Sequence, residues 1–329
     1  MKKALKILGI ILAAIVILVV LVIAGFNIFQ HISYSDFYAT AEKEFEIPGL
    51  SDDFVPQGLT FDDKSNMYVI CGYMKDGSNS RIYTINPKTN DSSYIVLDNH
   101  CHAGGLTIAN GYLFLCTDDL ISIYDWTNRD EENFKPIATF DPLTGPAFIH
   151  AEGDLLYVGE FYIAEDYETD ESHHFTTDSG DYNQAVMTVF SLSDVIQSIT
   201  DNTAVLPLYA LSICDNAQGM CILPNGNICI STSWGLTTSH IKQYEDPSDF
   251  VDAAENADTY YEAGDGVKIP LYYLDSAHLV KDTTLQPMSE ELYFDGERIL
   301  IMCESASNKY IFGKFTSSKY CYSFILDTQ

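Results

Sequence analysis

The chain is poor in basic residues. Of its 329 residues only 17 are Lys or Arg, against 47 Asp or Glu. Lys2, Lys3 and Lys6 precede a long apolar run, so the chain after that run has a net charge of −33. Nucleic acid and anionic lipid would be repelled by this charge, and we exclude nucleic acid as a partner.

The sequence also lacks the familiar catalytic motifs. It has no GxSxG elbow, no HExxH, no P-loop, no GxGxxG after a strand and no EF-hand spacing. None of its eight cysteines forms a CxxC pair, and most stand in apolar runs. If the protein is exported, they could form disulfides or pack as small buried thiols, and the spacing leaves both open.

A long apolar run lies near the N-terminus. Residues 7–26 contain no polar side chain, and a helix of that length covers the ~30 Å hydrocarbon core of a bilayer. The three lysines before the run place the N-terminus in the cytoplasm and the rest of the chain outside. Val22 and Ala24 could mark a signal-peptide cleavage site, but the run exceeds the usual signal core, which favours an uncleaved anchor.

After the anchor a repeated unit occurs five times. Each unit has a turn, a short apolar strand, a second turn and a stronger apolar strand. The second strands cover 67–73, 112–118, 155–161, 227–233 and 299–305, and one of their columns holds only small residues, Cys71, Cys116, Gly159, Ser231 and Cys303. Small residues at one repeated strand position are typical of the crowded centre of a β-propeller.

Further strands complete the predicted units. Third strands are predicted at 81–86, 121–126, 185–192, 269–275 and 320–327, and fourth strands at 93–98, 136–141, 206–213 and, more faintly, 279–285. Unit five has no fourth strand, but residues 43–48 have no partner of their own and can close the ring. We therefore predict an all-β fold, a propeller of five four-stranded blades, with six blades as the alternative.

The predicted organisation has four parts. These are a cytoplasmic basic stub at 1–6, a transmembrane helix at 7–26, a short tether at 27–42 and an extracytoplasmic propeller at 43–329. Acidic insertions at 162–183 and 236–267 are placed between second and third strands, where they can line the mouth of a site. Within the first insertion, His173 and His174 are interpreted as part of a solvated loop rather than a metal site.

Polar residues at the ends of the inner strands form the candidate site. The candidate catalytic residues are Glu290, Glu304, His102 and His150, and the candidate ligand-binding residues are Gln57, Gln218, Glu152 and Glu160. Glu290 and Glu304 could also hold a divalent cation such as calcium. The alternatives are hydrogen bonds from the glutamines to loop backbone, and ion pairs of the two glutamates with Lys309 or Arg298.

Several short motifs resemble those of a known group of proteins. The motifs are Val55-Pro56-Gln57-Gly58-Leu59, His102-Ala103-Gly104-Gly105, Gln218-Gly219, Ser289-Glu290 and Glu304-Ser305-Ala306-Ser307-Asn308-Lys309-Tyr310. They resemble an uncharacterised family of bacterial exported, membrane-anchored propeller-like proteins, although Glu291 stands where that pattern has glycine. A looser similarity to strictosidine-synthase, gluconolactonase and paraoxonase propellers implies a calcium-dependent hydrolase or lactonase, whose metal ligands are not matched here.

Two functions follow from these observations. The first is a binding module that presents a loop-rich face to a small molecule, glycan or protein at the cell surface, with the membrane contacted through the N-terminal helix. The second is a hydrolase with an axial active site. The missing catalytic motifs favour binding.

Overall fold

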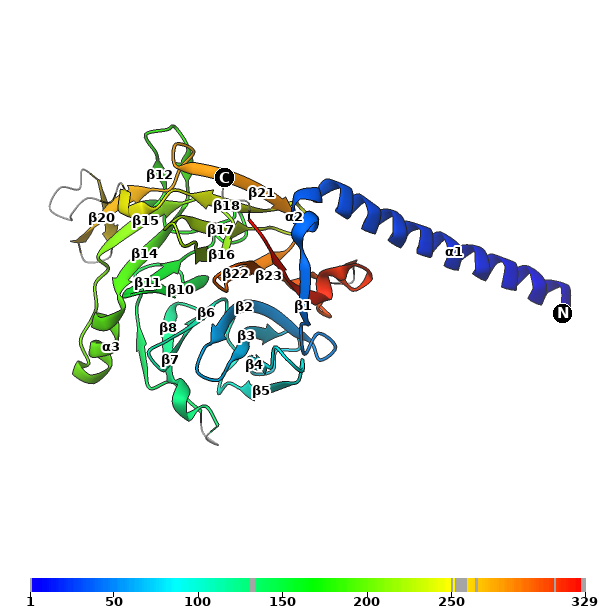
Figure 1. The fold of residues 1–329 in the computed structure, drawn as a ribbon, viewed down its shortest axis with the longest axis horizontal. Helices are drawn as coiled ribbons and strands as arrows, with labels where there is room; N and C mark the ends of the chain where they lie inside the picture. The colour runs from blue at the N-terminus through cyan, green and yellow to red at the C-terminus, as the bar shows by residue number, and fades with distance from the viewer. Residues whose placement is uncertain are drawn as a thin grey trace.

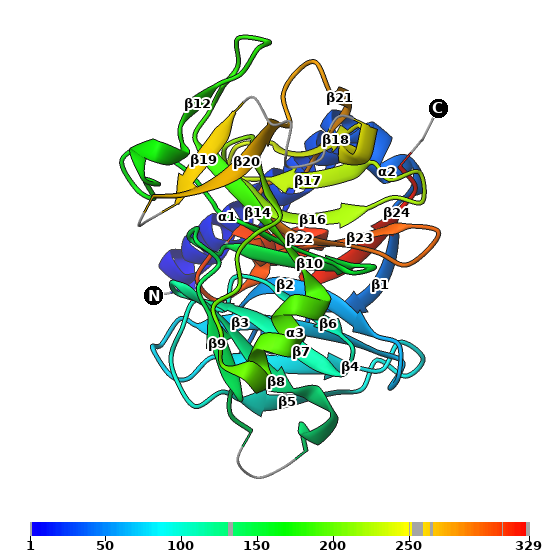
Figure 2. The same ribbon diagram turned by 90° about the vertical axis from the view of Figure 1, so that its left-hand side faces the viewer.

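Five β-sheets are arranged in a ring around a central axis (Figure 1). The structure, a computed structural model, describes residues 2–130, 134–249, 251, 259–263, 266–310 and 312–326. Over these residues each sheet is one blade of a propeller, and the first strand of each blade lies nearest the axis (Figures 1 and 2). The predicted fold class and blade number are confirmed.

The first two blades follow the repeat closely. Blade one consists of β2 (Phe54–Asp62), β3 (Met67–Met74), β4 (Arg81–Ile85) and β5 (Ser92–Val96), and blade two of β6 (Leu106–Ala109), β7 (Tyr112–Thr117), β8 (Leu120–Asp125) and β9 (Ala138–Phe140). Their strands pair antiparallel in sequence order. Short connections join the strands of blade one and the first three strands of blade two, whereas twelve residues separate β8 from β9.

The ring is closed by the N-terminal strand. Blade five consists of β22 (Ser289–Phe294), β23 (Ile299–Cys303), β24 (Tyr320–Phe324) and β1 (Glu42–Glu46). In it β1 pairs antiparallel with β24, with Phe45 opposite Cys321. The prediction that the segment at 43–48 supplies the missing strand is confirmed, and the two ends of the propeller are joined.

The crowding near the axis explains the small residues of the second strands. The phenyl ring of Phe148 fills the space where Gly159 would carry a side chain, and a Cβ at Gly58 would lie 2.7 Å from the Cys71 sulfur. Cys71 and Ser231 are fully buried. All eight cysteines are buried and free of disulfides, so they pack as small side chains within the core.

Blades three and four differ from the prediction. Blade three contains β10 (Phe148–Glu152), β11 (Leu155–Gly159), β14 (Ala185–Ser191), β15 (Tyr209–Ile213), β20 (Val267–Tyr273) and β19 (Tyr260–Ala263), and blade four contains β16 (Ala217–Ile222), β17 (Ile228–Thr232), β18 (Ser239–Tyr244) and β21 (Leu279–Leu285). The segment predicted as the third strand of unit four is β20, which instead pairs parallel with β15. That prediction is wrong, and β18 lies inside the predicted insertion at 236–267.

Short elements decorate the ring. In blade three, β12 (Phe175–Thr176) and β13 (Tyr182–Asn183) form a hairpin, and α3 (Leu192–Asp201) follows β14. The described residues also contain these 3-10 turns: η1 (Trp126–Asn128), η2 (Glu171–His173), η3 (Pro247–Asp249), η6 (Glu304–Ala306), η7 (Phe312–Phe315) and η8 (Ser317–Lys319). The last three lie between β23 and β24, and the first of them, η6, begins at the predicted site residue Glu304.

One long apolar helix precedes the propeller. This helix, α1 (Lys2–Ser33), is the one helix in the described residues that is long and apolar enough to cross a membrane. In Figure 1 it runs outward from the rim of the ring on the side of blade five. The segment predicted as a tether is mostly helical, because α1 continues to Ser33 and α2 (Ser35–Thr40) follows.

Candidate functional site

A cavity of about 540 Å³ lies on the axis, at the end of the ring where the inner strands begin. Six of the eight predicted site residues line it, from all five blades: Gln57, His102, Glu160, Gln218, Glu290 and Glu304. Gln57, Gln218 and Glu290 stand near the start of β2, β16 and β22, because equivalent strand positions of a propeller face the same axis. The repeat alone therefore brings these side chains together.

Two glutamates form the base of this axial cavity. Glu290 is 2% exposed, and burial together with the nearby Glu304 and Glu291 carboxylates raises its pKa well above the ordinary value. Burial also raises the pKa of Glu304, although Lys309, Tyr310 and Gln57 oppose the rise. Two carboxyl groups this close cannot both ionise cheaply, so we infer that Glu290 holds a proton and Glu304 carries the charge.

Gln57 and Lys309 surround the charged member of the pair. The Gln57 amide donates from Nε2 to Glu304 Oε2 at 3.2 Å. The Lys309 ammonium lies 5.0 Å from the ring centre of Tyr73 and 5.2 Å from that of Tyr310, and it donates to the Tyr73 hydroxyl. The base of the cavity thus presents a neutral acid, a carboxylate and an ammonium group, which together are close to neutral.

His102 belongs to the same cluster. Its ring stacks on Tyr73 with 5.2 Å between the ring centres. Although part of the side chain is exposed, desolvation by the surrounding protein and the positive charge of Lys309 lower its pKa, which favours the uncharged imidazole. A neutral imidazole can accept a hydrogen bond from a ligand or serve as a base.

The carboxylate of Glu160 is occupied by hydrogen bonds within the protein, although the residue lines the cavity. It is 2% exposed and accepts hydrogen bonds from Thr144 Oγ1 at 2.6 Å and from the Val186 backbone nitrogen at 2.8 Å. His173 Nδ1 lies 2.8 Å from Glu160 Oε1, and Tyr261 contacts the other ring nitrogen of His173 at 3.0 Å. The prediction of a solvated loop at His173 is therefore wrong, because this side chain ties the insertion to blade three.

An aromatic wall stands beside the polar base. Phe161, Tyr167 and Trp234 contact one another, with ring centres 5.8 to 6.0 Å apart. Tyr167 is 58% exposed and Trp234 is 36% exposed, so both rings offer area to a ligand. Sequence reasoning missed all three, because they stand just after the second strands or in an insertion, outside the repeated positions.

His150 and Glu152 do not line the axial cavity. Both lie on β10, and their side chains contact each other at 3.9 Å. The strand begins at Phe148 beside the cavity, so Glu152, its last residue, stands at the opposite end. The prediction that these two residues join the site is corrected by this strand direction.

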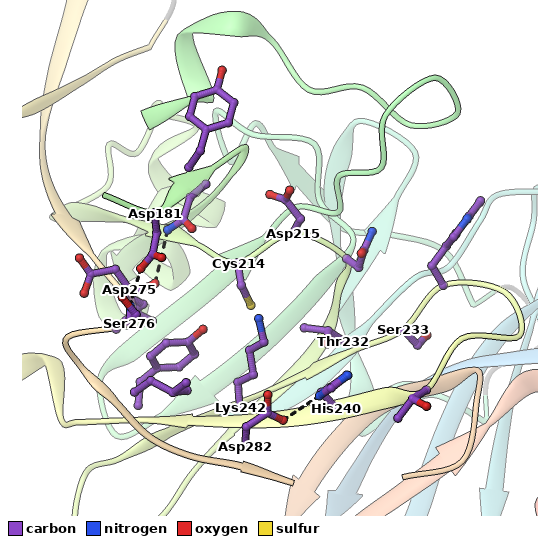
Figure 3. A pocket seen from close by; sticks show the side chains of 18 of the residues that line it. Asp181, Cys214, Asp215, Thr232, Ser233, His240, Lys242, Asp275, Ser276 and Asp282 are labelled. Carbon is purple, nitrogen blue, oxygen red and sulfur yellow. Dashed lines mark hydrogen bonds and ion pairs between the residues drawn. The ribbon is translucent and has the colours of Figure 1, made fainter. Parts of the chain in front are cut away.

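A second cavity, of about 650 Å³, lies between blades three and four (Figure 3). In Figure 3 the Lys242 ammonium points towards Cys214, and Asp215 stands above them. His240 Nδ1 lies 2.8 Å from Asp282 Oδ1, which joins β18 to β21. Trp234 lines this cavity as well as the axial one. The sequence did not predict this cavity, because its pattern does not reveal β18.

A calcium site does not fit the predicted ligands. Calcium takes six to eight oxygen ligands. Within the described residues no group of three or more His, Cys, Asp or Glu side chains is arranged to hold a metal ion. Glu304 also already bonds Gln57 and faces Lys309, whose charge opposes a cation. The base of the axial cavity therefore does not fit calcium.

The buried glutamates give the fold a pH dependence. Because folding raises the pKa of Glu290, this group stabilises the native state fully below its unfolded pKa and loses that contribution as the pH rises through its folded pKa. Each pH unit crossed in that window costs about 1.4 kcal/mol. Relative to the wild type, Glu290→Gln should gain stability between pH 5 and pH 8, as measured by urea unfolding.

The matched control for this measurement is Asp62→Asn. The pKa of Asp62 is lowered by hydrogen bonds from Ser65, Trp126 and the Lys64 backbone. Its contribution is complete above its unfolded pKa of about 3.9 and is therefore constant between pH 5 and pH 8. A Glu290→Gln curve that runs parallel to the wild type would contradict a protonated Glu290.

Comparison with known proteins gives no family. No family model matches the chain, and no curated protein matches it. The PQQ-bound aldose sugar dehydrogenase of Streptomyces coelicolor is 10% identical, with 86% of this chain and 96% of that chain covered and a TM-score of 0.46. The computationally designed protein Ika8 is 10% identical over 82% and 71% of the two chains, with a TM-score of 0.33. Neither likeness indicates a function for this chain. The resemblance to an exported propeller family stays a prediction.

Proposed function

We propose that the protein is a membrane-anchored, extracytoplasmic β-propeller that binds a small polyhydroxylated molecule, such as a short glycan, in the axial cavity. The observation that carries this proposal is the meeting of Glu290, Glu304, Gln57 and Lys309 at the base of an aromatic-walled cavity. A volume of about 540 Å³ lies within the usual range of ligand pockets, roughly 300 to 1,000 Å³.

The chemistry of the base suits hydroxyl groups. A protonated Glu290 and the Lys309 ammonium donate hydrogen bonds, whereas the Glu304 carboxylate accepts them. Hydroxyl groups can both donate and accept, so they can satisfy all three partners. The base itself is close to balanced in charge, whereas Asp118, Asp119, Glu168 and Asp170 also line the cavity and disfavour an anionic ligand.

The wall suits the apolar face of a sugar ring. Trp234 and Tyr167 are exposed aromatic rings, and aromatic rings supply large contact area with little loss of side-chain freedom. Stacking on these rings while hydroxyl groups reach the polar base would fix the orientation of a ring-shaped ligand.

The N-terminal helix supports the proposed location. The apolar run at 7–26 is long enough to span, and the three lysines before it favour a cytoplasmic N-terminus. Because β1 follows α2 directly, the propeller stands next to its anchor on the outer side.

Binding is tested with the full chain in detergent micelles. A panel of mono- and oligosaccharides is titrated by calorimetry, and the ligand found is then used with variants. We expect Glu304→Gln and Trp234→Ala each to weaken binding at least tenfold, about 1.4 kcal/mol. Glu152→Gln, at the far end of β10, is the matched control and should bind like the wild type. Failure of the whole panel, or equal binding by all variants, would refute the proposal.

A hydrolase is the second candidate, favoured by the unequal environments of Glu290 and Glu304. A carboxyl pair of this kind can divide the roles of acid and base. Glu290 would protonate the leaving oxygen while Glu304 accepts a proton from the attacking water. In that case Glu290→Gln should bind the glycan but release no product, as followed by chromatography of the incubated ligand.

A further inference from the structure

The end of α1 is fixed to the propeller. Asn27 Nδ2 donates to the backbone oxygen of Phe315 at 3.0 Å. Gln30 is 4% exposed, and Tyr34 and Phe37 belong to the core cluster between blades four and five. The end of the helix is therefore held against the propeller and is not joined to it by a flexible linker. As a result, the depth of the helix in a membrane also fixes the depth of the part of the propeller rim that contacts it.

Apolar side chains from three separate segments gather at this junction. A cavity of about 240 Å³ there is lined by Phe26 and Phe29 of α1, by Leu236 of the loop after β17 and by Pro287. Leu236 is 66% exposed, and Phe315, which contacts the helix through its backbone, is 50% exposed. We call the exposed side chains Phe29, Leu236 and Phe315 the junction patch.

The level of this patch along the helix axis indicates which environment surrounds it. The apolar run ends at Phe26, and a helix rises 1.5 Å per residue, so Phe29 lies within about 5 Å of the end of the run. Leu236 and Phe315 are at the same level, since they meet the helix at 26–30. If residues 7–26 span the bilayer, all of these side chains lie at the boundary between hydrocarbon and headgroups.

We infer that the junction patch is covered by the outer lipid interface, so that the rim of the propeller rests on the bilayer beside its own anchor. The inference depends on the anchoring stated in the proposed function but not on its ligand. Burial of Leu236 and Phe315 in lipid removes apolar area from water, which accounts for two large apolar side chains on the rim of an acidic domain.

This contact has a consequence for the axial cavity. Leu236 stands two residues after Trp234, on the loop at 233–238, and Trp234 is part of the aromatic wall. Figure 1 looks down the ring, and α1 leaves it to one side, while Figure 2 shows that the helix is also inclined along the depth of that view. If residues 7–26 cross the bilayer, the ring axis therefore lies closer to the membrane plane than to its normal, and the axial cavity does not face directly away from the membrane.

The test uses variants of the full chain that each carry one added surface cysteine labelled with an environment-sensitive fluorophore. Leu236→Cys and Phe315→Cys are placed in phosphatidylcholine vesicles that contain a phosphatidylcholine with a nitroxide quencher on its acyl chain. Leu206→Cys is the matched control, because Leu206 is 56% exposed but lies beside α3, across the ring from α1. Leu18→Cys, in the middle of the apolar run, reports insertion of the helix, and the wild type with its buried thiols gives the background.

We expect positions 236 and 315 to be quenched at least threefold more strongly than position 206, and position 18 to be quenched most. If position 18 is quenched while 236 and 315 behave like 206, the helix is an anchor but the rim does not rest on lipid, and the inference fails alone. If position 18 is not quenched, both the anchoring and the inference are wrong. Glycan binding by the axial cavity is tested separately, by the calorimetric titration.

Discussion

A chain that lacks residues 1–47 is expected to lose the folded propeller, whereas a chain that lacks only residues 1–33 is expected to keep it. The difference is β1, which completes blade five by pairing with β24. Phe45 and Ile47 are each 2% exposed and belong to the core cluster shared by blades five and one. Without β1 the ring is open, β24 becomes an unpaired edge, and that cluster faces water.

The two chains are compared by size-exclusion chromatography, near-ultraviolet circular dichroism and urea unfolding. In the full chain, Phe45→Ala should lower the free energy of unfolding by about 3 to 4 kcal/mol, the usual cost of emptying a buried phenylalanine site. Glu42→Ala, in the same strand with an exposed carboxylate, is the control and should change it by about 0.5 kcal/mol or less. Cooperative unfolding of the chain without 1–47 at the wild-type midpoint would show that the ring does not need closure.

The repeat predicted the fold because a propeller is built from local pairings. Four strands joined by short turns give one blade, so alternation and turn residues specify blades one and two directly. Closure could be predicted because blade five lacked a strand and the segment at 43–48 lacked a partner. Both arguments use only the requirement that a sheet edge be paired.

The same reasoning failed where pairing is not local. The sequence of β20 is more apolar than that of β18, so its pattern predicts β20 as the third strand of unit four. Instead, β20 adds to the outer edge of blade three, parallel to β15, across a long connection. Because β18 contains polar residues such as Lys242 and Gln243, its sequence does not show the apolar pattern of a strand, although it pairs with both β17 and β21.

The part of the candidate site that the sequence predicted correctly lies at positions that repeat from blade to blade. Residues at repeated strand positions, such as Gln57, Gln218 and Glu290, converge because the blades are equivalent. His173 and Trp234 come from segments that no repeat governs, so only the folded chain shows that they reach the cavity. His150 was misplaced because the direction of β10, and not the repeat, decides which end of that strand faces the cavity.

Glu291 stands where the other units carry small residues, and the structure gives its role. It is 1% exposed, and its side chain fills the axial space beside Gly219 and Gly105, where a Cβ on Gly105 would lie 3.2 Å from Glu291 Oε2. Its Oε1 accepts from the Met220 backbone nitrogen at 2.9 Å and from that of Leu292 at 3.3 Å. Burial raises its pKa well above the ordinary value, which favours the neutral acid, and its buried Oε2 has no hydrogen-bond partner among the described residues.

Glu291→Ala should therefore lower the free energy of unfolding by about 3 kcal/mol, because it leaves the Met220 N–H without an acceptor and opens a void on the axis. Glu291→Gln keeps the acceptor and the volume, and should cost about 1 kcal/mol or less. Both are measured by urea unfolding at pH 7, with the exposed Glu297→Ala in the same blade as the control. If Gln were as damaging as Ala, the carboxyl group itself would be required, and the account of Glu291 as a hydrogen-bonded filler of the axis would be wrong.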